Sequence, residues 1–321
     1  MDLERMLAMC RRDQWHVDDL DWSVPPRAMP REHEEAVCQY FEDMSGIELL
    51  AGELFKVQRD RATDPVVREI FHTFVLDEAR HAVVARRLSR HYDVHRYRRY
   101  ERNPHLVRFA KHFVHACRYL SAEIANAYIT AGELLLDIAL LRSIDDFVDD
   151  EMSRQAMTLI NRDESRHIAM DYYMTEYYAS EAYRRELASM PPRPPAETLA
   201  AYRALVAFMW HAAPFFRAVF FEPMDLVDPG GRRLQEAFKR MQLLGTKPGV
   251  AERPFTRFMR GLQDAFHHPW LGPMLAPVIA RIMGVEPRVI RRLYTEDEAR
   301  RVARMSFEEL AQEALAAKYV N

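Results

Sequence analysis

The chain has 321 residues, of which 49% are hydrophobic and 29% charged, a composition typical of a globular protein and unlike that of disordered or collagen-like chains. Its 45 basic and 48 acidic residues give a formal net charge of −3, so no overall basic field indicates a nucleic-acid partner. Only 10 glycines are present, which disfavours a β protein with many tight turns.

Four long helices are predicted in the first part of the chain, because apolar residues recur there at helical spacing. The pair Asp64-Pro65 is a helix-start signal, and the proline-rich segment 190–197 ends the fourth helix. Shorter helices separated by Pro and Gly follow, and no strand pattern is evident. The predicted helices are 31–60, 65–91, 106–141, 147–180, 197–221, 232–244, 255–267, 275–283 and 306–319.

This order of elements predicts an all-α fold, in which an antiparallel four-helix bundle over residues 31–190 forms the core. The short helices of residues 196–321 need a surface on which to bury their apolar faces, so we expect them to pack on the bundle within a single domain.

The cysteines and the N-terminus favour a cytoplasmic protein. Cys10, Cys38 and Cys117 are far apart and odd in number, which predicts neither a disulfide framework nor a zinc ribbon. The first residues contain no apolar run long enough for a signal peptide, and no segment approaches about 18 uncharged apolar residues. We therefore expect no membrane association.

A five-residue pattern, DE-x-RH, occurs twice, at residues 77–81 and 163–167. Residues three apart share a helix face, so Glu78 with His81, and Glu164 with His167, each form a pair of neighbouring ligands. One such pattern alone would indicate a charged surface patch. Two identical copies whose neighbours are largely apolar indicate buried groups that bind something.

Two further carboxylates are expected from the first and third long helices. Glu48 and Glu133 are favoured over their rivals Glu53 and Glu123, because they precede the two DE-x-RH motifs by 28 and 29 intervening residues. Both pairs thus reach a similar height in the bundle. Four carboxylates and two imidazoles, without a thiolate, suit two Fe or Mn ions rather than structural zinc.

The doubled motif, E-x28-DEARH followed by E-x29-DESRH, resembles that of ferritin-like di-iron carboxylate oxygenases. It is similar, more narrowly, to that of the p-aminobenzoate N-oxygenase family, and it covers residues 48–167. Subunits of bacterial multicomponent monooxygenases carry very similar motifs. The resemblance implies a ferritin-like bundle that holds two Fe ions, or a mixed Mn/Fe pair, and uses O2 as co-substrate. The implied ligands are Glu48, Glu78, His81, Glu133, Glu164 and His167.

One position departs from the N-oxygenase pattern. That family adds a third His four residues before the Glu of the second motif, where this chain has Ile160. A seventh ligand is therefore missing, or another histidine supplies it. The histidines available for this role are His72, His112, His115 and His211.

The remaining motif residues are expected to support the ligands. A metal-bound His is usually oriented by a carboxylate on its other ring nitrogen. As in similar di-iron bundles, we predict that Asp163 pairs with His81 and Asp77 with His167. Arg80 and Arg166 would neutralise these aspartates, and solvent-exposed ion pairs are the alternative. Asp137 and Asp171 are weaker candidates for the same supporting role.

The resemblance implies O2 activation through a peroxo-diferric intermediate, with amine N-oxygenation of a small molecule as the specific expectation. C–H hydroxylation or desaturation is the alternative among enzymes. A ferritin-like iron-oxidising or storage protein is the alternative of another class, although about 170 residues suffice for a storage bundle. A ribonucleotide reductase small subunit would require a radical tyrosine close to the cluster. Tyr128, Tyr172 and Tyr173 could serve as radical or electron-relay tyrosines, but core packing is the favoured explanation for them.

An oxygenase needs an electron donor such as a ferredoxin or a reductase. A basic cluster around the link that follows the second helix is either a solvated face or a docking surface for an acidic donor. A homodimer is left open. The cluster comprises Arg86, Arg87, Arg90, Arg96, Arg98, Arg99 and Arg102.

Overall fold

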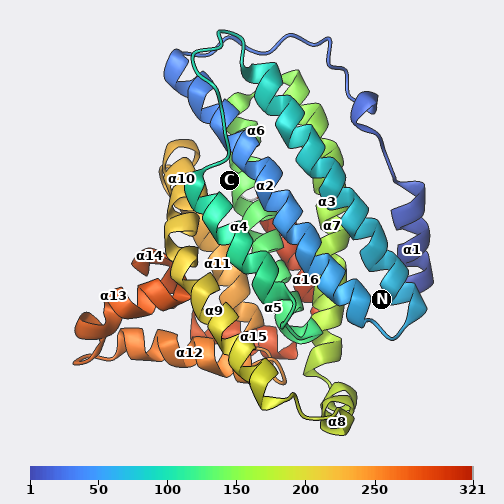
Figure 1. Ribbon diagram of the computed structural model, residues 1–321, viewed down its shortest axis with the longest axis vertical. Coiled ribbons are helices and arrows are strands. Elements are labelled where there is room, and N and C mark those ends of the chain that lie inside the picture. The colour runs from blue at the N-terminus through green and yellow to red at the C-terminus, as the bar shows by residue number, and fades with distance from the viewer. Residues whose placement is uncertain (320–321) are drawn as a thin grey trace.

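The computed structural model describes residues 1–319, and all regular elements within that range are helical (Figure 1). The N-terminal half contains α1 (Leu3–Arg12), η1 (Val17–Asp19), α2 (Arg31–Arg61), α3 (Pro65–Tyr92), α4 (Pro104–Cys117), α5 (Ala122–Leu135), η2 (Leu136–Leu141) and α6 (Arg142–Val148). The rest contains α7 (Glu151–Ala179), α8 (Glu181–Ser189), α9 (Pro195–Phe216), η3 (Arg217–Phe221), α10 (Glu222–Val227), α11 (Arg232–Leu244), α12 (Pro254–His267), α13 (Gly272–Met283), α14 (Pro287–Ile290), α15 (Glu296–Arg304) and α16 (Phe307–Ala317).

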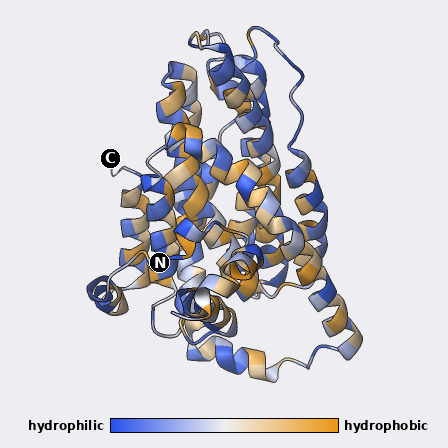
Figure 2. Cartoon of the chain, turned by 90° about the vertical axis from the view of Figure 1, so that its left-hand side faces the viewer, coloured by the Kyte–Doolittle hydropathy of each residue, from blue (hydrophilic) through white to orange (hydrophobic). Residues whose placement is uncertain are grey.

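Four long helical segments form the centre of the molecule: α2, α3, the continuous run α5–η2–α6, and α7 (Figure 1). Helix α2 packs against α3 and α5, and α7 packs against α3 and α5, so the four segments enclose a common core. Figure 2 shows hydrophobic and hydrophilic residues interspersed along the helices, as expected for helices with one buried side.

The helix starts follow from local capping groups. Before α3, the Asp64 carboxylate accepts hydrogen bonds from the backbone N–H groups of Val66 and Val67 at 2.7 and 3.2 Å, and Pro65 takes the first helical position. Before α7, the Asp150 carboxylate accepts from the backbone N–H of Ser153 at 2.8 Å. These caps fix where the two helices that carry the DE-x-RH motifs begin.

The prediction of one helix over 106–141 is wrong, because the chain turns between α4 and α5. The Ser121 hydroxyl accepts a hydrogen bond from the Ile124 backbone N–H at 3.2 Å and starts a new helix. Helix α4 packs chiefly against α9 and also contacts α2, while the third core segment runs through the π-helical turn η2 to Val148. Helix α7 begins at Glu151 rather than at 147. Helices α1, α8 and α15 are additional to those predicted from the sequence.

Most later helices cover the core. Helix α11 packs against α5 and η2, α16 packs against α7, and α9 packs against α4. Helices α12 and α13 pack on each other, and α13 also packs on α9, so this pair lies at the periphery (Figure 1).

Two helical runs are long and apolar enough to cross a membrane, by length and composition alone. They are Ala122–Val148, of which 72% of the apolar window is buried, and Pro195–Val227, of which 39% is buried. The first is a core segment of the fold, and a buried core helix passes this test as readily as a membrane span does.

Candidate metal centre

Six predicted ligands come together from four core helices. Glu48 lies on α2, Glu78 and His81 on α3, Glu133 on α5, and Glu164 and His167 on α7. None of these side chains is more than 1% exposed. The three-residue spacing within each motif turns both of its ligands toward the same point of the core.

The six side chains form two overlapping groups of possible metal ligands. One group contains Glu48, Glu78, His81 and Glu164, and in each group the ligand atoms lie within 4.8 Å of one another. The other contains Glu78, Glu133, Glu164 and His167. Glu78 and Glu164 belong to both groups, which is the arrangement expected of carboxylates placed between two ions.

The histidines present the same ring nitrogen to this centre. His81 Nδ1 lies 3.1 Å from a Glu164 oxygen, and His167 Nδ1 lies 3.0 Å from the other Glu164 oxygen and 3.2 Å from a Glu78 oxygen. Each Nε2 therefore faces away from the centre and is available to a supporting group.

Many of the inward-facing atoms have no hydrogen-bond partner within residues 1–319. They include both oxygens of Glu48 and of Glu78, one oxygen each of Glu133 and Glu164, and His81 Nδ1. A buried polar atom without a partner costs roughly 1–3 kcal/mol, and more when it is charged. Two divalent cations would supply partners to these atoms and would balance the four carboxylate charges, so the residues present fit a dinuclear metal site.

Burial and mutual repulsion shape the protonation of the metal-free centre. Burial, followed by the charges of Glu78 and Glu164, raises the pKa of Glu48 well above its usual range, and burial with the Glu164 charge does the same for Glu133. Burial alone would lower the pKa of the two histidines, but the surrounding carboxylates outweigh it and raise the pKa of both. Burial also opposes ionisation of Glu164, yet His167 and its other partners lower its pKa.

These shifts predict an unusual pH dependence. Glutamate and histidine groups with a raised pKa bind protons more tightly in the folded chain than in the unfolded one. Their stabilising effect is complete below the ordinary values of 4.5 and 6.5 and is lost as the pH rises through the folded values. The lowered pKa of Glu164 acts in the opposite sense only near and below 4.5.

We therefore expect the melting temperature of the metal-free protein to fall between about pH 5 and about pH 8. Metal binding displaces those protons, so the stabilisation that Fe(II) provides should increase over the same range. Anaerobic thermal melts at both pH values, with and without Fe(II), check this. A metal-free protein that becomes more stable toward pH 8 would contradict the assignment of these groups.

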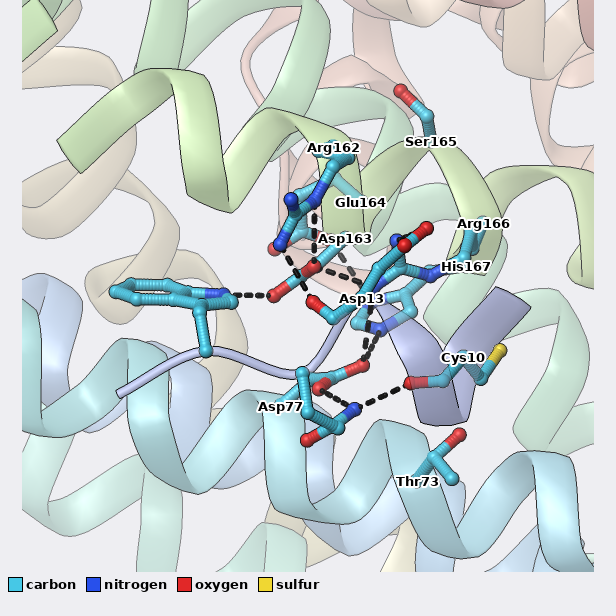
Figure 3. A network of polar contacts seen from close by, with 12 residues as sticks. Cys10, Asp13, Thr73, Asp77, Arg162, Asp163, Glu164, Ser165, Arg166 and His167 are labelled. Carbon is cyan, nitrogen blue, oxygen red and sulfur yellow. Dashed lines mark hydrogen bonds and ion pairs between the residues drawn. The ribbon is translucent and has the colours of Figure 1, made fainter. Parts of the chain in front are cut away.

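The predicted supporting aspartates lie on the outer sides of the histidine rings. Asp163 Oδ2 is 3.1 Å from His81 Nε2, and Asp77 Oδ2 is 3.5 Å from His167 Nε2, so each Asp pairs with the histidine of the other motif. Both carboxylates are completely buried. Figure 3 shows Asp77 and Asp163 on either side of the Arg166 and His167 side chains.

Two arginines neutralise these aspartates. Arg166 donates to Asp163 at 2.5 Å, and Arg80 donates to Asp77 and reaches Asp163 at 3.2 Å. Burial opposes ionisation of Asp163, but the hydrogen bond from His81 and its other partners lower its pKa. The alternative of solvent-exposed ion pairs does not hold, because Arg80 and Arg166 are only 11% and 7% exposed.

An N-terminal segment that the sequence did not single out closes this side of the centre. The Trp15 indole N–H donates to Asp163 Oδ2 at 2.7 Å, and the Trp15 ring stacks near His81 with centroids 6.4 Å apart. The Gln14 amide donates to Asp77 at 3.1 Å and accepts from Arg80 at 2.8 Å. Because α1 packs against α3 and α7, it holds this segment in place.

Substituting Trp15 tests this contact. Trp15→Phe keeps an aromatic ring but removes the N–H that fixes Asp163, and loss of such a supporting hydrogen bond typically costs 10–100-fold in metal affinity. We expect a loss of about tenfold in Fe(II) affinity, measured by anaerobic calorimetry. The matched control is Trp22→Phe, because the Trp22 N–H donates to the Val17 carbonyl at 2.7 Å instead. Equal affinity in both variants would show that Trp15 only packs.

The two rival glutamates lie outside the centre. Glu53 pairs with Lys56 at 2.5 Å on its own helix, and Glu123 is held by two hydrogen bonds from Arg253, one of them 2.6 Å long. Sequence spacing thus distinguished Glu48 and Glu133, which face the centre, from Glu53 and Glu123, which do not.

None of the four alternative histidines replaces the ligand missing at Ile160. Within the described chain, both candidate metal groups consist only of the six predicted ligands. His72 and His115 are exposed, and His112 stacks on His211 with ring centroids 4.6 Å apart. Ile160 itself is completely buried.

The two weaker acidic candidates are both buried beside the centre but outside both groups. Burial raises the pKa of Asp137 to about 6 against the opposing effect of Lys318, whose Nζ lies 3.1 Å from it. Lys318 follows α16, so the C-terminal helix is tied to η2 through this pair. The Asp171 carboxylate lies four residues after His167 and has no hydrogen-bond partner within residues 1–319.

A cavity of about 400 Å³ adjoins the centre, and its lining includes Glu133. Its walls come from α2, α4, α5 and α7 on the core side and from α9, α11, α12 and α13 on the outer side. A buried pair of ions would therefore have a space for an organic molecule next to it.

Comparison of the chain with protein-family models, with curated proteins and with solved structures gave no match.

Proposed function

We propose that this protein is a non-haem di-iron oxygenase with a ferritin-like four-helix bundle. The observation that carries this proposal is the pair of buried ligand groups that share Glu78 and Glu164. The carboxylate and imidazole donors suit Fe or Mn, in accord with the resemblance of the doubled motif to di-iron carboxylate oxygenases. Two iron ions, when bound, would supply the reducing electrons that activate O2.

The protein's own groups would set the conditions for that chemistry. Glu48 and His81 would hold one ion, Glu133 and His167 the other, and Glu78 and Glu164 both. Asp163 and Asp77 orient the imidazoles through their Nε2 atoms. Complete burial of the ligands excludes bulk water, which protects a reactive site from side reactions.

The substrate would occupy the cavity beside Glu133. Amine N-oxygenation in specialised metabolism is the reaction that the resemblance favours. C–H hydroxylation or desaturation is the second candidate, favoured by the largely aromatic and aliphatic walls of the cavity. Iron oxidation and storage is the alternative of another class, and it gives no role to this cavity.

An external electron donor, such as a ferredoxin or a reductase, would have to dock on the surface. The basic cluster at the end of α3 and in the following link is a weak candidate, because acids neutralise several of its members. Arg86 pairs with Glu42, Arg87 with Asp18, Arg98 with Glu35, and Arg99 with Glu101. This pairing favours the interpretation of the cluster as a solvated face.

Anaerobic titration with Fe(II), followed by exposure to O2, tests the proposed function. We expect saturation at about two irons per chain. When an arylamine or an apolar substrate is present, we expect it to gain oxygen or lose hydrogen, which mass spectrometry detects. Iron uptake that continues far beyond two per chain after O2 is added would overturn the proposal in favour of storage.

A further inference from the structure

The cavity beside Glu133 is large for a substrate built on one ring. An engineered protein cavity of about 150 Å³ holds a benzene molecule, so a cavity of about 400 Å³ has room for roughly two to three such units. It lies within the size range of sites for drug-sized ligands and cofactors.

Aromatic and aliphatic side chains dominate the lining, and several of its polar groups bond to one another, although the buried Asn126 Oδ1 has no hydrogen-bond partner within residues 1–319. Asn126 donates to the Thr175 hydroxyl at 2.8 Å, and the Thr130 hydroxyl donates to the Asn126 carbonyl at 2.7 Å. The charged lining residues are Glu123, Glu133, Arg253 and Arg260. Glu123 and Arg253 neutralise each other, and Glu133 faces the metal centre. The body of a ligand in this cavity would therefore be largely apolar, with the Asn126 amide oxygen as one available acceptor.

Arg260 is the cationic lining residue that no acid neutralises within residues 1–319. Its side chain is exposed, it lines the cavity, and it has no hydrogen bond or ion pair within residues 1–319. It lies on α12, which packs chiefly against α13 at the periphery (Figure 1). Glu133, by contrast, is buried on the core helix α5. The cavity thus has an unpaired cation at its outer side and the metal centre at its inner side.

Gly132 keeps the inner part of the cavity open. It lies in the interior of α5, next to Glu133, and lines the cavity. A Cβ atom added to it would meet nothing within 4 Å. Glycine in a helix interior is less favourable than alanine, so Gly132 lowers the stability of α5. Because Gly132 lines the cavity and its surroundings are open, a longer side chain at this position would extend into the cavity.

We propose that the cavity binds a long-chain monocarboxylic acid, with its carboxylate on Arg260 and its apolar chain extending toward Gly132 and Glu133. A single unpaired guanidinium matches a single negative charge, and its planar geometry suits a carboxylate. The inference rests on the proposed function for the role of the bound molecule, and within that function it favours C–H oxidation over N-oxygenation. Binding itself needs no iron.

The test is calorimetric titration of the full-length protein with dodecanoate, and with 1-dodecanol as the uncharged analogue. We expect dodecanoate to bind, and 1-dodecanol to bind about tenfold more weakly. Arg260→Gln should lose about tenfold in affinity for dodecanoate and none for 1-dodecanol. Arg257→Gln is the matched control, because Arg257 is exposed on the same helix and does not line the cavity. Both arginines are exposed, so neither substitution should unfold the chain.

A second pair of variants tests the inner end. Gly132→Leu should abolish dodecanoate binding, while Gly132→Ala should retain it with a higher melting temperature, and circular dichroism confirms that both are folded. Equal dodecanoate affinities of the Arg260→Gln and Arg257→Gln variants, or tight binding to Gly132→Leu, would overturn the proposal. Iron content is measured separately. A protein that loads two irons per chain but does not bind dodecanoate would reject only this inference. A protein that binds dodecanoate but fails to load two irons per chain would reject only the proposed function.

Discussion

Replacing Glu164 with glutamine is expected to abolish tight Fe(II) binding at both positions of the centre. Glu164 belongs to both ligand groups, and its two oxygens lie 3.1 and 3.0 Å from the Nδ1 atoms of His81 and His167. Glutamine has nearly the same shape but lacks the charge, and one of its terminal atoms cannot coordinate a cation. Metal content after anaerobic loading should fall from about two irons per chain to nearly none.

Glu53→Gln is the matched control for this substitution. Glu53 lies on α2, five residues after Glu48, but it pairs with Lys56 rather than facing the centre. We expect the Glu53 variant to bind two irons with unchanged affinity. A Glu164→Gln protein that still binds two irons as tightly as the unmodified protein would show that Glu164 does not serve both ions.

Replacing Glu48 with leucine is expected to stabilise the metal-free protein while it weakens iron binding. Glu48 is completely buried, and neither of its carboxylate oxygens has a hydrogen-bond partner within residues 1–319. Leucine has a similar volume, favours the helix and removes the unsatisfied group. The free energy of unfolding of the metal-free protein should rise by about 1–3 kcal/mol in anaerobic urea titrations.

Glu34→Leu provides the contrast on the same helix. Glu34 is also buried, but its two oxygens accept from the His95 backbone N–H at 2.9 Å and contact His95 Nδ1 at 2.7 Å. Its loss leaves those groups without partners, so this variant should be destabilised, by about 1–3 kcal/mol. If both leucine variants lose stability equally, Glu48 stabilises the metal-free fold, which would contradict the interpretation that it destabilises this fold and serves metal binding.

Together these two experiments separate affinity from stability. Glu164 shares a hydrogen bond of 3.0 Å with His167 Nδ1, whereas neither oxygen of Glu48 has a hydrogen-bond partner within residues 1–319, although both residues are predicted ligands. Ligand groups that lower the stability of the metal-free protein are expected at a functional site, because function requires them there.

The sequence by itself determined the convergence of the six predicted ligands. Within each DE-x-RH motif, helical periodicity alone places the Glu and the His on one face, and periodicity is a local property of the chain. The near-equal spacing of Glu48 and Glu133 from their motifs separated them from Glu53 and Glu123, because helices of similar length return the chain to a similar height.

Local signals were misleading where they were weak. Ser121, the residue that caps α5, stands in a run of residues with continuous helical spacing, so the pattern predicts helix through the turn before it. The π-helical turn η2 directly follows α5. The spacing of its apolar residues does not distinguish so short a π-helix from an α-helix, so the sequence does not predict it.

Only the tertiary structure decided which distant groups support and adjoin the centre. Trp15 lies outside the helices, and its contact with Asp163 spans 148 positions. Lys318 reaches Asp137 only because α16 packs on α7. The cavity lined by Glu133 and Arg260 is formed between helices that are far apart in the chain. The sequence does not reveal it, because apolar residues that line a cavity show the same pattern as apolar residues packed in a core. The periodicity of a helix predicts which of its faces is buried, whereas only the packing of the whole chain determines which residues that face contacts.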